Sequence, residues 1–275
     1  MGVTGCRIDV PAELTEAHLR AISRYLVDRF GLSDVEWSHL LVAMDILRRA
    51  TLTQGNRRWT FAALYRQLVD DVYADGYIAA CYGFADVATE GERLRAAIAR
   101  QIVHVLRERG FYSHRVPESQ ILAAFMVYWW ESFARGYAFE VEIFRDLVAS
   151  GIVFTGHALR SRRERWSRHD LVVLGYRGDI KLSTYFLHVR RNRLAAQEFC
   201  ITRLYHRPTH QWKRVVLLRE HVWRTLNGEP RSVATPDDVW DIFPGAARLR
   251  LQRQTWVVVL YEWWKERVYQ LQSEV

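Results

Sequence analysis

Residues 168–183 read Arg-His-Asp-Leu-Val-Val-Leu-Gly-Tyr-Arg-Gly-Asp-Ile-Lys-Leu-Ser. A run of four apolar residues, two punctuating glycines and an alternating second segment predict two short β-strands joined by a tight turn. Gly175 and Tyr176 suit a two-residue hairpin loop that has glycine at its first central position. The second half of the chain is therefore predicted to contain a β-sheet that includes this hairpin.

The predicted hairpin carries its charges on one face. With Gly175 and Tyr176 as the loop, Asp170 lies opposite Lys181, and Asp179 lies on the diagonal at roughly 7–8 Å. Asp179 and Lys181 point to the same face because they are two residues apart on a strand. Two carboxylates and an ammonium group are costly to bring together unless a cation or a phosphate lies among them. The alternative is an ordinary hairpin with solvated charges.

Lysine is rare in this chain. Of its 39 basic residues only Lys181, Lys213 and Lys265 are lysines, and the other 36 are arginines. The ordinary positive charge of this protein is thus a guanidinium group. A lysine at 181 indicates a position that requires a compact ammonium group instead.

Asp170, followed after eight residues by Asp179-Ile180-Lys181, resembles the core motif of the PD-(D/E)XK nuclease superfamily. The resemblance extends over about residues 136–220. It implies a restriction-endonuclease-like fold and a metal-dependent DNA endonuclease that hydrolyses phosphodiester bonds with Mg²⁺, or with Mn²⁺ as a substitute. Defence, mobile-element and repair systems are the settings that such an activity implies.

The superfamily also places an acid on the helix before the hairpin, in a Phe-Glu pair eleven residues ahead of a glycine. Here Glu140 stands in that place relative to Gly151, and Glu142 is the alternative acid. Helical periodicity favours Glu140, because it shares a face with the apolar residues that follow. The implied metal ligands are Asp170, Asp179, Glu140 and the carbonyl of Ile180. Lys181 is expected to orient the attacking water or to stabilise transition-state charge.

The net charge of +8 lies entirely in the second half. Residues 1–135 contain 16 basic and 16 acidic residues, whereas residues 136–275 contain 23 and 15. A polyanionic partner is therefore expected to meet the second half. The candidate nucleic-acid contacts next to the hairpin are Arg160, Arg162, Arg163, Arg165 and Arg168. The alternative for this segment is a solvated loop.

The first half, residues 1–135, is predicted to be an all-helical domain. Apolar periodicity predicts helices over residues 12–31, 33–49, 60–69, 90–109 and 117–135. Arg57, Arg58 and Arg66 would suit a helix-turn-helix reader of DNA. A docking or oligomerisation domain, contacting a second copy or a partner protein, is favoured because this half is electrically neutral.

The second half, residues 136–275, is predicted to be an αβββαβ domain with a mixed sheet, so the fold class is α+β. Its expected elements are a helix from 136, a strand near 152–154, the hairpin, a strand through 189, a helix over 194–205 and a strand over 212–218. Residues 219–275 are expected to add a strand at 248–254 and a strand or final helix at 256–271.

Other classes of function find little support in the sequence. The three cysteines have no metal-type spacing and therefore do not predict a zinc site. His157 and His169 lie near the hairpin but are expected to stay outside the ligand set. The longest apolar runs are too short to span a membrane and no signal pattern is visible, so a cytoplasmic location is predicted. The alternative function is a non-catalytic nucleic-acid-binding or assembly protein.

Overall fold

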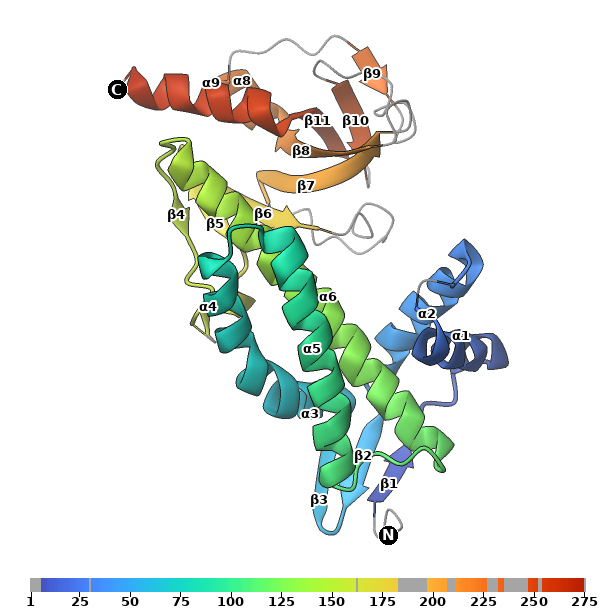
Figure 1. Cartoon of the computed structure of the whole chain (residues 1–275). Coiled ribbons are helices and arrows are strands. Elements are labelled where there is room, and N and C mark those ends of the chain that lie inside the picture. Colours follow the sequence, from blue (N-terminus) through green and yellow to red (C-terminus); the bar gives the residue numbers. More distant parts are fainter. Residues whose placement is uncertain are drawn as a thin grey trace. The chain divides into compact units, whose positions relative to one another are not determined.

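The structure is a computed structural model, and its chain forms two compact units, Met1–Arg135 and Gly136–Val275. It describes residues 6–29, 31–161, 163–182, 197–206, 211–226, 232–234, 247–251 and 254–274. Both units combine helices with β-strands, so the chain is a mixed α/β protein (Figure 1). Within the described residues, every helix is too short or too polar to cross a membrane.

The prediction that the first unit is all-helical is wrong, because this unit contains a three-stranded antiparallel sheet. Its strands are β1 Cys6–Asp9, β2 Thr51–Gln54 and β3 Arg57–Thr60, in the order β1-β2-β3. Leu52 of β2 is fully buried and pairs with Ile8 and Trp59, so one face of the sheet joins the core. The turn between β2 and β3 depends on Gly55, whose φ is 56°.

The helices that the sequence predicts in the first unit form, together with a further helix over residues 75–83. The helices are α1 Glu16–Val27, α2 Asp34–Leu47, α3 Phe61–Tyr65, the π-helical η1 Arg66–Ala74, α4 Asp75–Gly83, α5 Val87–Glu108 and the first part of α6 Pro117–Ala149. Ser33 and Glu36 form a capping box at the start of α2. Thr60 caps α3, and its Oγ1 accepts the N–H of Ala63 at 3.1 Å.

The sequence predicts that this helix ends at residue 135, but α6 runs on to Ala149. Gly136 lies in its interior, where a methyl group would meet no neighbouring atom within 4 Å. A glycine inside a helix costs only about 1 kcal/mol relative to alanine, so it does not force a break. The second part of α6 belongs to the second unit and carries Glu140.

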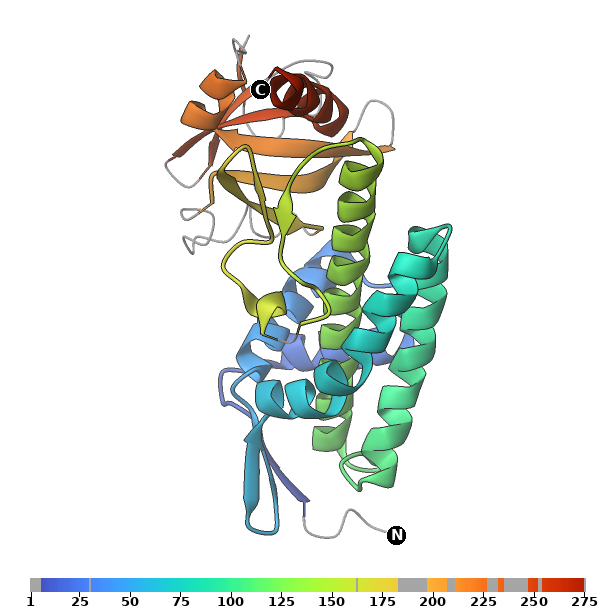
Figure 2. The ribbon, with the colours of Figure 1, turned by 90° about the vertical axis from the view of Figure 1, so that its left-hand side faces the viewer.

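The second unit is built on one eight-stranded mixed sheet (Figures 1 and 2). The strands are β4 Thr155–Gly156, β5 Leu171–Val173, β6 Tyr176–Lys181, β7 Phe199–His206, β8 Gln211–Arg219, β9 Ser232–Ala234, β10 Ala247–Leu251 and β11 Gln254–Leu260. Their order is β4-β5-β6-β7-β8-β11-β10-β9, with parallel pairs β6–β7 and β9–β10 and antiparallel pairs elsewhere. Among the described residues of this unit, the other helical elements are η2 Glu164–Trp166, α8 Glu220–Thr225 and α9 Tyr261–Ser273. Helix α9 packs against β8 and β11.

The hairpin forms where the sequence predicts it, but in a different register. Leu174 and Gly175, with φ values of 51° and 81°, make the loop, and Leu171 pairs with Gly178. The pairing is thus two residues away from the predicted one. Extending the observed register by one residue sets Asp170 opposite Asp179, not opposite Lys181. Because the side-chain period of a strand is two, the three charged side chains still share one face.

One prediction after the hairpin and one before it need correction. The helix expected over residues 194–205 is wrong from Phe199 onward, where the chain forms β7 parallel to β6. Its first residues, and the strand expected through residue 189, lie outside the described residues. The strand expected over 212–218 is confirmed as β8, and the residues from 256 to 271 form the end of β11 followed by α9. The strand expected near 152–154 begins at Thr155.

Candidate metal centre

Two carboxylates of the hairpin converge on one backbone N–H group. The N–H of Ile180 donates to Asp170 Oδ2 at 2.7 Å and to Asp179 Oδ1 at 3.1 Å. Asp170 is tied to the same strand, because its own N–H donates to the carbonyl of Gly178 at 2.9 Å. Ile180 was predicted to offer its carbonyl to a metal ion, but its contact with the carboxylates is made through its N–H.

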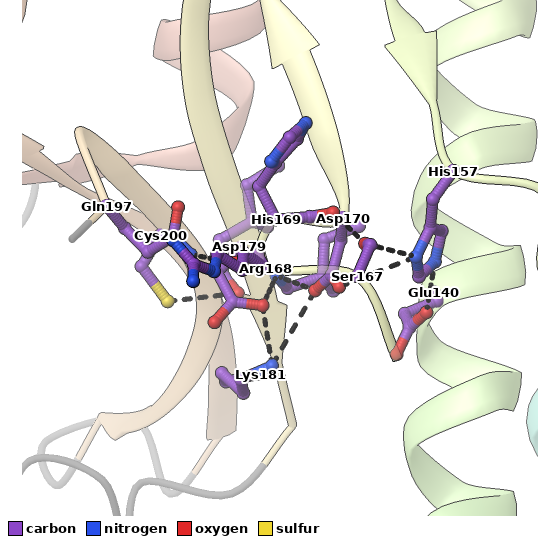
Figure 3. Close-up of polar contacts among 12 residues, drawn as sticks. Glu140, His157, Ser167, Arg168, His169, Asp170, Asp179, Lys181, Gln197 and Cys200 are labelled. Atoms are coloured by element: carbon purple, nitrogen blue, oxygen red, sulfur yellow. Dashed lines mark hydrogen bonds and ion pairs between the residues drawn. The ribbon is translucent and has the colours of Figure 1, made fainter. Parts of the chain in front are cut away.

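Lys181 reaches both of these carboxylates (Figure 3). Its Nζ lies 2.5 Å from Asp179 Oδ1 and 3.6 Å from Asp170 Oδ2. Burial alone would lower the pKa of Lys181, but the charges of Asp170 and Asp179 outweigh it and hold that pKa above its ordinary value. The lysine side chain is still 43% exposed, so water weakens these ion pairs.

His157 joins this hairpin to helix α6. Its Nε2 lies 3.0 Å from Glu140 Oε2, and its Nδ1 lies 3.8 Å from Asp170 Oδ1. Nδ1 also lies 3.2 Å from the hydroxyl of Ser167. The backbone N–H of His157 donates to the backbone carbonyl of Asp170 at 2.8 Å, which fixes the backbone of both residues. With only 6% of its side chain exposed, His157 is held between the two acids (Figure 3).

Glu140, His157 and Asp170 form a group of donors that suits a divalent cation. One ligand atom from each lies within 4.8 Å of the other two. Two ligands of one Mg²⁺ ion with bonds of about 2.1 Å lie at most about 4.2 Å apart. The three side chains would therefore need to move closer together to share an ion. Carboxylate oxygen suits Mg²⁺ and Mn²⁺, and imidazole nitrogen also suits first-row transition metals.

The protonation of this group depends on its neighbours. Burial and a hydrogen bond to Asp170 raise the pKa of Asp179 to about 7, while the charge of Lys181 opposes that rise. Burial lowers the pKa of His157, but its hydrogen bond to Glu140 and the charges of Glu140 and Asp170 outweigh burial and raise it. Such shifts are typical of sites where several ionisable groups are held together for a purpose.

The two acids proposed for helix α6 lie in different surroundings. Glu140 contacts His157 at the hairpin. Glu142 instead lies 3.4 Å from Nη1 of Arg214 on β8, and Arg214 also binds Glu262 at 2.7 Å. The structure therefore brings Glu140 to Asp170 and leaves Glu142 in an ion-pair network with α9.

The arginines before the hairpin divide into two kinds. Arg160, Arg163 and Arg168 are exposed, as nucleic-acid contacts would have to be. Arg165 was placed with them and is a poor candidate, because only 9% of it is exposed. Its Nη1 donates to the carbonyl of Leu159 at 3.1 Å, and its guanidinium lies over the ring of Tyr137. The fifth arginine, Arg162, lies outside the described residues.

His157 is the residue of the site that the sequence pattern does not single out. It had the same weight as His169, whose ring is not among the donors that the described residues group together. What brings His157 to Asp170 is the ladder of β4 and β5, in which Gly156 pairs with Leu171. No local spacing could have revealed this, because β4 is only two residues long. Comparisons with protein-family models, with curated proteins and with solved structures find no match to this chain.

Proposed function

We propose that this protein is a metal-dependent nuclease of the PD-(D/E)XK kind that hydrolyses phosphodiester bonds in DNA. The observation that carries the proposal is the convergence of Glu140, His157 and Asp170 within 4.8 Å, beside Asp179 and Lys181 on the same hairpin. Further support comes from the order of elements, in which a helix bearing one acid precedes the hairpin and β6 pairs in parallel with the next strand, β7.

In this proposal the chain's own residues have separate tasks. Glu140, His157 and Asp170 would hold the ion, and Asp179 would complete its surroundings once it has lost its proton. A divalent cation, when bound, lowers the pKa of water and neutralises charge on the scissile phosphate. Lys181, being partly exposed and positively charged, would orient the attacking water or stabilise the charge that develops on the phosphate oxygens. Arg160, Arg163 and Arg168 would contact neighbouring phosphates.

The charges of the candidate site also support a second candidate, a non-catalytic nucleic-acid-binding or assembly protein. Lys181 already pairs with Asp170 and Asp179, and His157 already pairs with Glu140. On this reading the charged groups stabilise the fold and need no ion. A metal titration separates the two candidates, because only the nuclease should gain thermal stability from divalent ions, and the gain should grow with the logarithm of the ion concentration above the Kd.

The direct test is incubation of the purified protein with supercoiled, linear and single-stranded DNA in Mg²⁺, Mn²⁺ or EDTA. We expect metal-dependent cleavage by the wild type and its loss in Asp179→Ala and in Lys181→Ala, with circular dichroism showing that both variants fold. Glu142→Ala is the matched control, because this acid on the same helix pairs with Arg214 and should keep the activity. Unchanged cleavage by both hairpin variants would refute the assignment.

A further inference from the structure

The neutral charge of the first unit conceals a separation of charge. Over residues 1–135 the 16 basic and 16 acidic residues cancel. Three segments, residues 6–9, 51–60 and 107–118, nevertheless hold six arginines and only three acids. The rest of the unit then holds ten basic and thirteen acidic residues. Charges separated by more than about 8–10 Å are screened from each other in physiological salt, so a polyanion would respond to the local excess rather than to the sum.

These three segments lie together in the folded unit. The antiparallel pairing of β1 with β2 and of β2 with β3 joins the first two segments. The turn between α5 and α6 reaches the hairpin through Phe111, whose ring lies 6.3 Å from that of Trp59. Figures 1 and 2 both show the β2–β3 hairpin and the α5–α6 turn at the same end of the unit. We call residues 6–9, 51–60 and 107–118 the hairpin-and-turn surface.

The acids of this surface do not neutralise most of its arginines. Asp9 binds Arg7 at 2.7 Å, and Glu108 lies 3.0 Å from His104 of the same helix. The remaining acid, Glu118, makes no ion pair within the part of the chain that the structure describes. In that same part, no carboxylate lies within ion-pair distance of the exposed side chains of Arg57, Arg107, Arg109 and Arg115. Arg58 is likewise exposed, and its Nη2 donates to the hydroxyl of Thr51 at 3.3 Å.

The chemistry of the surface fits a phosphate backbone better than a protein partner. Among its described residues no large apolar side chain is exposed, although the same unit exposes Leu19, Val27, Val35 and Val42 elsewhere. A protein interface needs a buried apolar or aromatic centre. Guanidinium groups match phosphate oxygens in pairs, and the hydroxyls of nearby threonines add further donors.

We propose that the hairpin-and-turn surface binds the phosphate backbone of nucleic acid without reading its sequence. The proposal deepens the proposed function, because it gives the first unit a share in holding the DNA that the second unit would cut. It rests on that function only for the choice of DNA as the ligand. Binding is measured in EDTA, so a failure of cleavage and a failure of binding are separate results.

The test compares two triple variants of the full chain. Arg57→Gln, Arg107→Gln and Arg115→Gln remove three charges from the surface. Arg20→Gln, Arg93→Gln and Arg100→Gln remove three exposed charges from elsewhere in the same unit. Affinity for a fluorescein-labelled duplex of about two helical turns is measured by anisotropy in EDTA over a series of salt concentrations.

Each lost phosphate contact should lower the slope of log K against log salt by about 0.9 and weaken binding at 0.1 M salt by about eightfold. We expect the surface variant to lose about two to three units of slope and the control variant to stay close to the wild type. Equal effects of the two variants, or no effect of either, would overturn the proposal. Unchanged DNA affinity together with lost binding to anionic lipid vesicles would overturn it too, and would assign the surface to a membrane.

Discussion

Replacing Asp179 with asparagine tests whether the hairpin carboxylates are held together for a cation. Burial and the hydrogen bond to Asp170 raise the pKa of Asp179 from 3.8 to about 7. Between about pH 4 and pH 7 the folded protein therefore keeps a proton that the unfolded chain has released. The stability of the metal-free protein then falls as the pH rises through this interval. Asp179→Asn removes that loss, because an amide does not ionise.

The size of the effect follows from the same shift. A carboxyl pKa that moves from 3.8 to about 7 corresponds to at most about 4 kcal/mol. We expect Asp179→Asn to stabilise the metal-free protein at pH 8 by roughly 1–3 kcal/mol, or about 2–4 °C of midpoint for each kcal/mol. In the wild type, an ion at a hundred times its Kd should add about 2.7 kcal/mol.

The assay is thermal unfolding at pH 5 and pH 8, in EDTA, Mg²⁺ and Mn²⁺. At pH 8 the variant should be more stable than the wild type in EDTA and should gain less from either ion. Asp146→Asn is the matched control. The carboxylate of Asp146 pairs with Lys265 Nζ at 2.7 Å and does not pair with the hairpin acids. The reasoning fails if Asp179→Asn is the less stable protein at pH 8 in EDTA and gains as much from divalent ions as the wild type does.

Three further predictions concern single side chains. Gly178→Ala should destabilise the protein by about 1–3 kcal/mol, because the new methyl group would lie 2.6 Å from Cε1 of the buried Phe199 on β7. The control Gly76→Ala has open space around the new methyl group and should be neutral or stabilising. Equal denaturation midpoints of the two variants would contradict this prediction. His157→Ala should weaken the binding of Mn²⁺ more than the binding of Mg²⁺ in calorimetric titrations, because imidazole prefers transition metals. An equal loss of affinity for both ions would remove His157 from the ligand set. Arg165→Ala should lower the melting temperature and Arg163→Ala should lower only DNA affinity, so the reverse pattern would show that their burial is misassigned.

The hairpin illustrates how much of the candidate site can be predicted from sequence. Its position and charged face follow from local alternation and from glycine punctuation, which are short-range signals. Its register does not, because the rule that puts glycine first in the loop competes with a loop in which Leu174 itself adopts a positive φ. The error of two residues is harmless to the site, since an even shift keeps Asp170, Asp179 and Lys181 on one face.

Other features depend on contacts that no local pattern contains. Residues 199–205 are predicted as part of a helix, yet they belong to a central strand between β6 and β8 in which Phe199 to Thr202 are all buried, so the usual strand alternation is missing. The four-residue strands of the first unit are too short to show a period. The neutrality of residues 1–135 is a sum, and a sum does not show where in the folded unit the charges lie.

Helix α6 has a practical consequence for anyone who would study the second unit alone. A chain begun at Gly136 would start inside this helix, with the amide groups of its opening turn deprived of the carbonyls they normally bond. Glu140 would then lie about one turn from a frayed helix end and would lose its fixed direction toward His157. If such a fragment fails to bind metal, the cut inside α6 can be the cause. A fragment that starts at Pro117 keeps the whole helix and avoids this error.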